Sequence, residues 1–223
     1  MRTTLIILVL FLINNRPVLG QAVPIPTNYT VIDTARGDLD KDGIAELVVA
    51  YNTRQKSEEP FENIPRELVI YKIQGKSWVP WKRSQQALYG SNDGGMMGDP
   101  FGELKIQQGI LLISHYGGSS WKWNHTDKYR FAHGSFSLIG YSAAYGKPCE
   151  YWTTVDFNLV TGKMIVKKEY EHCEDDSVAI YKKENETFYR KGLKIGLHNR
   201  NEREILIVTP KYRHEVYIAN KND

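Results

Sequence analysis

The stretch GDLDKDGIAELVVAY, residues 37–51, sets an acidic loop directly in front of an apolar strand. Counted from Asp38, carboxylates stand at loop positions 1, 3, 5 and 9, and glycine stands at position 6. Alternate residues of a tightly curled loop point their oxygens at one centre, and Gly43 permits the sharp bend. Four carboxylates at one centre repel each other unless a cation lies among them. The stretch therefore predicts a site for a hard divalent ion, and calcium, with its flexible oxygen shell, fits it best.

The residues around this loop favour a β-hairpin over the two helices of an EF-hand. An EF-hand loop has a bidentate glutamate at position 12, where this chain has Val49. The flanks Val31-Ile32-Asp33 and Leu47-Val48-Val49 are rich in β-branched residues, which favour strands. We therefore expect a calcium-binding hairpin loop at residues 37–46.

This loop and the strand after it resemble the calcium loop of FG-GAP repeats, the units of integrin-type β-propellers and related secreted bacterial proteins. The resemblance implies side-chain ligands from Asp38, Asp40, Asp42 and Glu46 and a carbonyl ligand from Ile44. It covers residues 37–51 only, and a glutamate stands at position 46 where the family more often has aspartate. A full propeller repeats its motif, whereas this chain has one copy. A polar turn without a metal is the alternative interpretation.

The first twenty residues have the features of a secretory signal. Arg2 gives a basic start, Leu5 to Ile13 form a short apolar core, and Val18-Leu19-Gly20 precede an expected cut before Gln21. The apolar run is short for a membrane-spanning helix, which leaves an uncleaved anchor as the weaker alternative. We expect residues 1–20 to be a signal peptide and the mature chain to be secreted or periplasmic, with no membrane insertion after cleavage.

Composition narrows the classes of partner. Removing residues 1–20 takes away Arg2 and Arg16 and no acids, which leaves 27 basic against 26 acidic side chains. A nearly neutral chain lacks the basic surface that binds nucleic acid or an anionic membrane. Residues 21–223 are long enough for one domain with a sizeable core.

Short runs of alternating apolar and polar residues predict an all-β fold. Turn residues separate these runs, and no long amphipathic helix is evident. The expected strands include Glu67–Ile73, Trp78–Trp81, Leu104–Ile106, Ile110–Ile113, Tyr129–Phe131, Phe136–Tyr141, Tyr151–Leu159, Lys163–Tyr170, Ile205–Val208 and Val216–Ile218. We expect one domain of antiparallel sheets, with a propeller-like, sandwich or barrel architecture left open.

The two cysteines, Cys149 and Cys173, flank a predicted hairpin. A turn centred on Thr161 places them opposite each other. In an oxidising compartment such a pair forms a disulfide, so we expect a structural bridge.

Two glycine-rich loops, residues 90–102 and 115–125, are the other candidate sites. The second loop carries His115, Trp121, Trp123 and His125, and its two tryptophans would face one side of an extended segment. Aromatic faces beside imidazole and amide groups can stack on a sugar or grip a peptide. The competing interpretation is that both tryptophans close the end of the core, because aromatic side chains mostly pack.

No sequence motif identifies an enzyme. Ser119 and Ser120 lie near His115 and His125, but the G-x-S-x-G elbow is missing and the histidines lack metal-ligand spacing. The sequence favours a calcium-braced binding or interaction module for an unknown protein or glycan partner. A hydrolase with an unrecognised site in the 115–125 loop is the alternative.

Overall fold

The computed structural model describes residues 22–54, 59, 62–174 and 177–219, and all its regular structure apart from two short 3₁₀ turns is β-strand. The predicted signal at residues 1–20 lies outside this part of the chain. The strands are β1 (Thr30–Gly37), β2 (Glu46–Asn52), β3 (Arg66–Gln74), β4 (Ser77–Ser84), β5 (Phe101–Gln107), β6 (Ile110–Gly118), β7 (Lys122–Ala132), β8 (Ser135–Lys147), β9 (Tyr151–Asn158), β10 (Lys163–Glu174), β11 (Ser177–Tyr189), β12 (Ile205–Val208) and β13 (Glu215–Ala219). The 3₁₀ turns are η1 (Gly95–Met97) and η2 (Leu197–Asn199).

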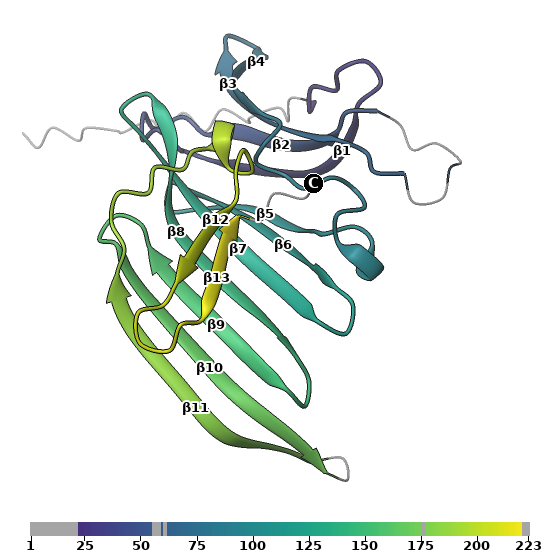
Figure 1. The fold of residues 1–223 in the computed structure, drawn as a ribbon. Coiled ribbons are helices and arrows are strands. Elements are labelled where there is room, and N and C mark those ends of the chain that lie inside the picture. The colour runs from purple at the N-terminus through teal and green to yellow at the C-terminus, as the bar shows by residue number, and fades with distance from the viewer. Residues whose placement is uncertain (1–21, 55–58, 60–61, 175–176, 220–223) are drawn as a thin grey trace, which may run out of the picture.

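Every strand pairs antiparallel with a neighbour along the chain, which gives three sheets. β1 to β4 form a four-stranded sheet, β5 to β11 form a seven-stranded sheet, and β12 pairs with β13. The C-terminal hairpin lies across the seven-stranded sheet, and the four-stranded sheet lies beyond the β5 end (Figure 1). The prediction of an all-β fold with antiparallel sheets is confirmed, and neither large sheet closes into a barrel.

Strand β2 is buried on both faces, as its unbroken apolar sequence predicts. Successive side chains of a strand point to opposite faces, so Val48 and Ala50 enter the main core. Leu47, Val49 and Tyr51 enter a second core on the other side of the four-stranded sheet. The loop before β2 is therefore attached to the interior of the molecule.

The C-terminal hairpin is fixed to the seven-stranded sheet by apolar and polar contacts. Its residues Ile205, Ile207, Val216 and Ile218 are buried in the main core. The hydroxyl of Tyr141 donates to the Tyr217 carbonyl at 3.2 Å, and that of Tyr145 donates to the Glu215 carbonyl at 2.9 Å. The Glu186 carboxylate accepts from the backbone N–H groups of Lys211 and Tyr212 at 2.6 and 3.3 Å.

The predicted disulfide between Cys149 and Cys173 is present, with a Cα–Cα distance of 5.1 Å. The predicted register of its hairpin is wrong by one residue, because Tyr151 pairs with Tyr170 instead of Glu171. Cys149 lies in the turn before β9 with a positive φ of 66°, and Cys173 lies opposite Val178 of β11. The bridge thus joins the β8–β9 turn to the end of β10.

In the described part of the chain, no helix has the length and hydropathy that crossing a membrane requires.

Replacing both Cys149 and Cys173 by serine should lower the free energy of unfolding. The chain-entropy argument gives at most about 3 kcal/mol for a loop of this size, and the hairpin that already orders the loop reduces the effect. Urea unfolding of the oxidised protein and of the double variant would measure the difference. Equal midpoints and slopes would show that the bridge adds no stability.

Candidate functional site

The predicted acidic loop connects β1 to β2 and curls as its sequence indicates. Gly43 has a φ of 85°, which favours glycine, and Lys41 has a φ of 66°. Backbone N–H groups inside the loop donate to its carboxylates. Gly43 donates to Asp38 Oδ2 at 3.0 Å, and Ile44 donates to Asp42 Oδ1 at 2.8 Å. These bonds hold the carboxylates in place from within the loop.

The fourth carboxylate of the loop is anchored in the interior. The side chain of Glu46 is only 1% exposed, and its Oε2 accepts from the Leu39 N–H at 2.7 Å. Burial raises the pKa of Glu46. A buried carboxylate needs a partner of opposite charge, because it has lost its contact with water.

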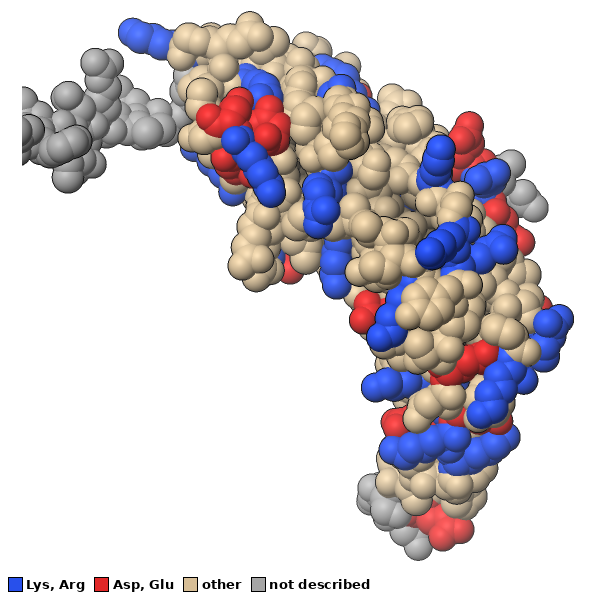
Figure 2. Space-filling view, turned by 90° about the vertical axis from the view of Figure 1, so that its left-hand side faces the viewer, with Lys and Arg blue, Asp and Glu red and all other residues tan. Residues whose placement is uncertain are grey.

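That partner is an ammonium group from outside the acidic motif. Lys72 of β3 extends its Nζ to the carboxylates of Asp40, Asp42 and Glu46, at 2.8 Å from Asp42 Oδ2 and 3.4 Å from Glu46 Oε1. In Figure 2, acidic side chains gather in one compact group near the upper end of the molecule, beside a basic side chain. The hydrogen bonds that Lys72 donates to the carboxylates of Asp40 and Asp42 raise the pKa of Lys72.

The donor set of the loop suits calcium. Single carboxylate oxygens of Asp38, Asp40 and Asp42 lie within 4.8 Å of one another, and carboxylate and carbonyl oxygens are the ligands that calcium prefers. One buried oxygen, Asp38 Oδ1, has no hydrogen-bond partner in the described residues. Asp38, Asp40 and Asp42 would hold the ion, and the ion would neutralise their charge. Glu46 is not one of these three grouped carboxylates, so Glu46 and the Ile44 carbonyl are ligands that only the resemblance implies.

A second candidate site lies on the face of the seven-stranded sheet that carries the C-terminal hairpin. Trp123, His125 and Asp127 occupy alternate positions of β7, so their side chains share one face of the sheet. A cavity of about 250 Å³ opens there. Its lining residues are Tyr89, Asp93, Trp123, Asn124, His125, Tyr141, Tyr217 and Ile218.

Four aromatic rings stand together around this cavity. The rings of Trp123 and His125 stack with centroids 5.8 Å apart, and those of His125 and Tyr141 stack at 5.7 Å. Tyr89 contributes a ring 5.8 Å from Trp123 and 5.6 Å from His125, tilted steeply against both. Burial raises the pKa values of Tyr89 and Tyr141, so both hydroxyls stay protonated at neutral pH.

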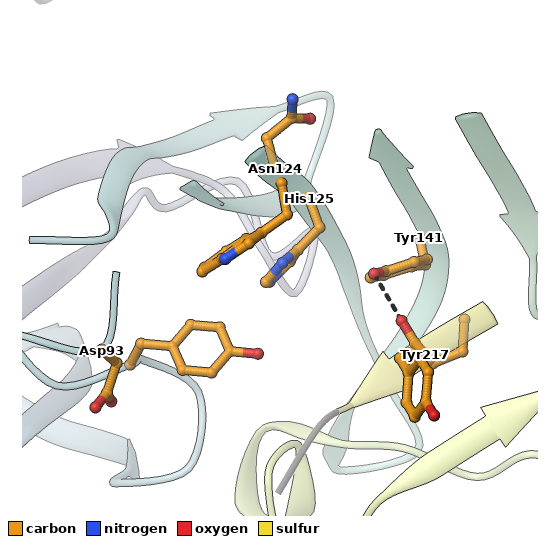
Figure 3. Close-up of a pocket in the computed structure, with 8 residues that line it drawn as sticks. Asp93, Asn124, His125, Tyr141 and Tyr217 are labelled. Atoms are coloured by element: carbon orange, nitrogen blue, oxygen red, sulfur yellow. Dashed lines mark hydrogen bonds between the residues drawn. The ribbon is translucent and has the colours of Figure 1, made fainter. Parts of the chain in front are cut away.

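The close-up of this pocket separates residues that enter it from residues at its rim. In Figure 3, His125 and Tyr141 extend into the space in front of Tyr217, and the dashed line joins the Tyr141 hydroxyl to the Tyr217 carbonyl. The amide of Asn124 and the carboxylate of Asp93 point away. The interior of the pocket is therefore built from aromatic side chains with polar tips.

A buried ion pair lies behind the aromatic rings. Arg200 follows η2, and its Nε and one terminal nitrogen donate to the two oxygens of Asp127 at 2.6 and 3.1 Å. The two side chains are 2% and 1% exposed. Tyr129 also donates to Asp127, at 3.2 Å. Because Arg200 precedes β12 in the chain, this pair ties the covering hairpin to β7.

His125 and the neighbouring His115 are both neutral at neutral pH. Burial, followed by the Arg200 charge, lowers the pKa of His125 to about 3. Burial and the neighbouring His125 lower the pKa of His115 well below its usual value. The His115 ring lies 5.2 Å from the His125 ring and 4.9 Å from Tyr89. At neutral pH the pocket wall therefore carries imidazole, a hydrogen-bonding group without charge.

The two glycine-rich loops of the sequence meet at this site. The Gly118 N–H donates to the Gly94 carbonyl at 2.8 Å. A Cβ on Gly117 would lie 2.8 Å from that same carbonyl and 2.6 Å from the Trp123 ring, so only glycine fits there. The backbone of the second loop therefore lies directly against the Trp123 ring.

The structure distributes the four predicted contact residues over three places. Trp123 and His125 line the cavity, and His115 lies buried behind it with 2% exposure. Trp121 is 43% exposed and packs on Tyr151, at a centroid distance of 5.1 Å, outside the cavity.

Sequence reasoning missed Tyr89, Tyr141, Arg200 and Tyr217. In this segment the sequence indicated only the alternation of Trp121 and Trp123. No local pattern pointed to Arg200, which lies 73 residues from Asp127.

The hydrolase alternative needs Ser119 or Ser120 beside His115 or His125. Within the described residues, neither Ser119 nor Ser120 is hydrogen-bonded to His115 or His125. The Ser119 N–H bonds to the Trp121 carbonyl, and the Ser119 carbonyl accepts from Lys122 Nζ at 3.1 Å. A serine nucleophile needs a base within hydrogen-bond reach.

Comparison with protein-family models, with curated proteins and with solved structures found no match for this chain.

Stability should fall as the pH is lowered from 6.5 toward 3, in part because of His125. In this window the unfolded chain binds a proton on that imidazole and the folded chain does not, so unfolding takes up a proton. Replacing His125 by phenylalanine should flatten the dependence by about 1 kcal/mol per pH unit between pH 6.5 and 5. Urea unfolding across this range tests it. Replacement of the exposed His172 by glutamine is the control, and equal slopes in wild type and His125→Phe would contradict the prediction.

Replacing Asp127 by alanine should destabilise the protein strongly, because it leaves the Arg200 charge buried and unpaired. We expect a loss of about 3–5 kcal/mol in urea unfolding. The double variant Asp127→Leu with Arg200→Met should recover most of it. Glu169→Ala breaks the exposed pair with Lys183 and should cost less than about 1 kcal/mol. Similar losses of unfolding free energy for Asp127→Ala and Glu169→Ala would show that the buried pair contributes no more to stability than an exposed pair.

Proposed function

We propose that the chain is an exported, calcium-braced binding module that takes one ring-sized group of its partner into the aromatic pocket. The observation that carries this proposal is the cavity in front of Trp123, His125 and Tyr141, closed on one side by Tyr89 and on the other by Tyr217. Concave sites lined by aromatic side chains with a few polar groups are typical of ligand binding.

The chemistry of the pocket favours a sugar ring of a glycan. Aromatic faces pack against the C–H groups of a sugar, while phenol and imidazole groups exchange hydrogen bonds with its hydroxyls. A charged ligand fits less well, because Asp127 and Arg200 satisfy each other and His125 is neutral. An aromatic side chain of a protein partner is the alternative occupant, which the experiment below distinguishes.

Two further features support the location and the brace. A disulfide is typical of proteins in oxidising compartments, which favours the secreted or periplasmic location proposed from residues 1–20. The acidic loop resembles that of FG-GAP repeats, and extracellular modules work with calcium sites as weak as about 10⁻⁴–10⁻³ M. We assign calcium a structural role, because the loop belongs to the β1–β2 hairpin and contributes no residue to the pocket.

The experiment is a titration of the protein with methyl glycosides of common neutral hexoses and with N-acetylglucosamine, followed by calorimetry and tryptophan fluorescence. We expect one sugar to bind and to change the tryptophan emission, because Trp123 lines the pocket. Replacing Tyr217 by alanine removes one wall and should weaken binding about tenfold or more, since an aromatic contact in a pocket contributes on the order of 1–2 kcal/mol.

The control is Tyr189→Ala, which removes another exposed tyrosine, 66% exposed against 40% for Tyr217, from the edge strand β11. Binding that Tyr217→Ala and Tyr189→Ala reduce equally would place the site elsewhere. Absence of sugar binding, together with binding of a peptide that carries an aromatic residue, would replace the glycan by a protein partner. Binding of neither would overturn the pocket as a recognition site.

A further inference from the structure

One cation, the ammonium group of Lys72, already lies among the carboxylates of the acidic loop. Lys72 stands on β3, one residue beyond the pair formed by Tyr71 and Leu47 of β2. That position places its side chain beside Glu46, the first residue of β2. An ammonium group has three N–H donors, and three carboxylates of the loop surround it.

The Lys72 side chain is held in this position from its other side as well. Its Nζ lies 4.7 Å from the centroid of the Trp81 ring on β4, within the range of a cation–π contact. The side chain is 25% exposed. Lys72 therefore has a defined place between an aromatic face and the loop.

We propose that Lys72 is an internal substitute for the loop's calcium ion, so that the ammonium group and calcium compete for the same carboxylate oxygens. Asp40, Asp42 and Glu46 bind Lys72 in the calcium-free protein. Calcium binding moves Lys72 out of the loop, and the loop keeps its curled conformation in either state. Lys72 thereby sets the calcium affinity of the loop.

Charge and space together support the competition. Two cations at one centre repel each other at close range, so calcium among these oxygens excludes the ammonium group. One ammonium charge neutralises one of the four carboxylates, which leaves the loop acidic and able to attract a divalent ion. The backbone donors to Asp38, Asp42 and Glu46 keep the loop shaped while the cations exchange.

The cost of displacing Lys72 lowers the apparent calcium affinity. If the lysine leaves the loop in one molecule out of ten or fewer, the dissociation constant rises about tenfold or more over that of an open loop. Removing the ammonium group removes this cost. It also removes the ammonium charge that is paired with Asp40, Asp42 and Glu46, so the calcium-free form loses stability.

The test compares wild type with Lys72→Met, which keeps the length of the side chain and removes its charge. Calcium titration by calorimetry should show affinity about tenfold or more tighter in the variant. Thermal unfolding in chelator should show the variant less stable than wild type, and millimolar calcium should restore it. Adding Asp40→Asn to the variant should abolish the tightening.

Lys82→Met is the matched control. Lys82 lies on β4, its Nζ is 5.8 Å from the same Trp81 ring, and it donates to the Gly134 carbonyl instead of the loop. This variant loses the same charge and should bind calcium as wild type does. Equal or weaker calcium affinity in Lys72→Met than in Lys82→Met would overturn the competition.

A second measurement uses wild type alone, so it tests the proposal even if the Lys72→Met variant does not fold with calcium. Reductive methylation followed by mass spectrometry reports the accessibility of each lysine. Calcium should increase the labelling of Lys72 and leave Lys82 unchanged, and unchanged labelling of Lys72 would overturn the proposal.

This inference rests on the calcium part of the proposed function. Absence of calcium binding in every variant refutes both, whereas calcium binding without displacement of Lys72 refutes the competition alone.

Discussion

The buried ion pair between Arg200 and Asp127 fixes the C-terminal segment on the seven-stranded sheet, and the aromatic pocket depends on that position. Apolar contacts alone are non-directional and would tolerate a shift of the hairpin along the sheet. A guanidinium that meets a carboxylate through two hydrogen bonds accepts one geometry. Only residues 201–204 separate Arg200 from β12, so the position of the pair carries over to β13 and to Tyr217. The desolvation of two charges is costly. The same pair holds Tyr217, a lining residue of the pocket, in one position.

The acidic loop also needs its charges to be paired, but here the carboxylates outnumber the cations. Glu46 begins β2, whose side chains enter both cores, so the loop cannot move its fourth carboxylate into water without disturbing the interior. Backbone donors stabilise the carboxylates but leave their mutual repulsion in place. A cation is the remaining solution, and Lys72 shows that the fold supplies one from a neighbouring strand. The loop therefore has a way to remain folded before it meets calcium.

Local patterns in the sequence predicted local structure well. The alternation of apolar residues predicted most of the strands, although not the greater part of β11, and spacing within residues 37–46 predicted the curled loop before β2. The pairing of Cys149 with Cys173 was predicted from a turn centred half a residue too far along the chain. The disulfide forms all the same, because Cys149 lies in a turn outside the β9–β10 ladder and does not follow its register. The partners that complete each site come from far away in the chain. Lys72 is 32 residues from Asp40, and Arg200 is 73 residues from Asp127. Such contacts follow from how sheets pack, and no single-sequence pattern encodes them.

The two sites lie in different sheets, and the contact between those sheets decides whether they can influence each other. The Asp33 carboxylate of β1 accepts from the Leu104 N–H of β5 at 3.1 Å, and Gly37 packs closely on Ile106. Order in the loop therefore supports β5, the edge of the seven-stranded sheet. The pocket lies farther into that sheet, on β7 and β8, where Asp127 and Arg200 hold it independently. A cation in the loop and a ligand in the pocket should thus stabilise the fold additively, as expected for distant sites without shared contacts. This separation supports the proposal that calcium braces the fold and that the aromatic pocket is the place of recognition.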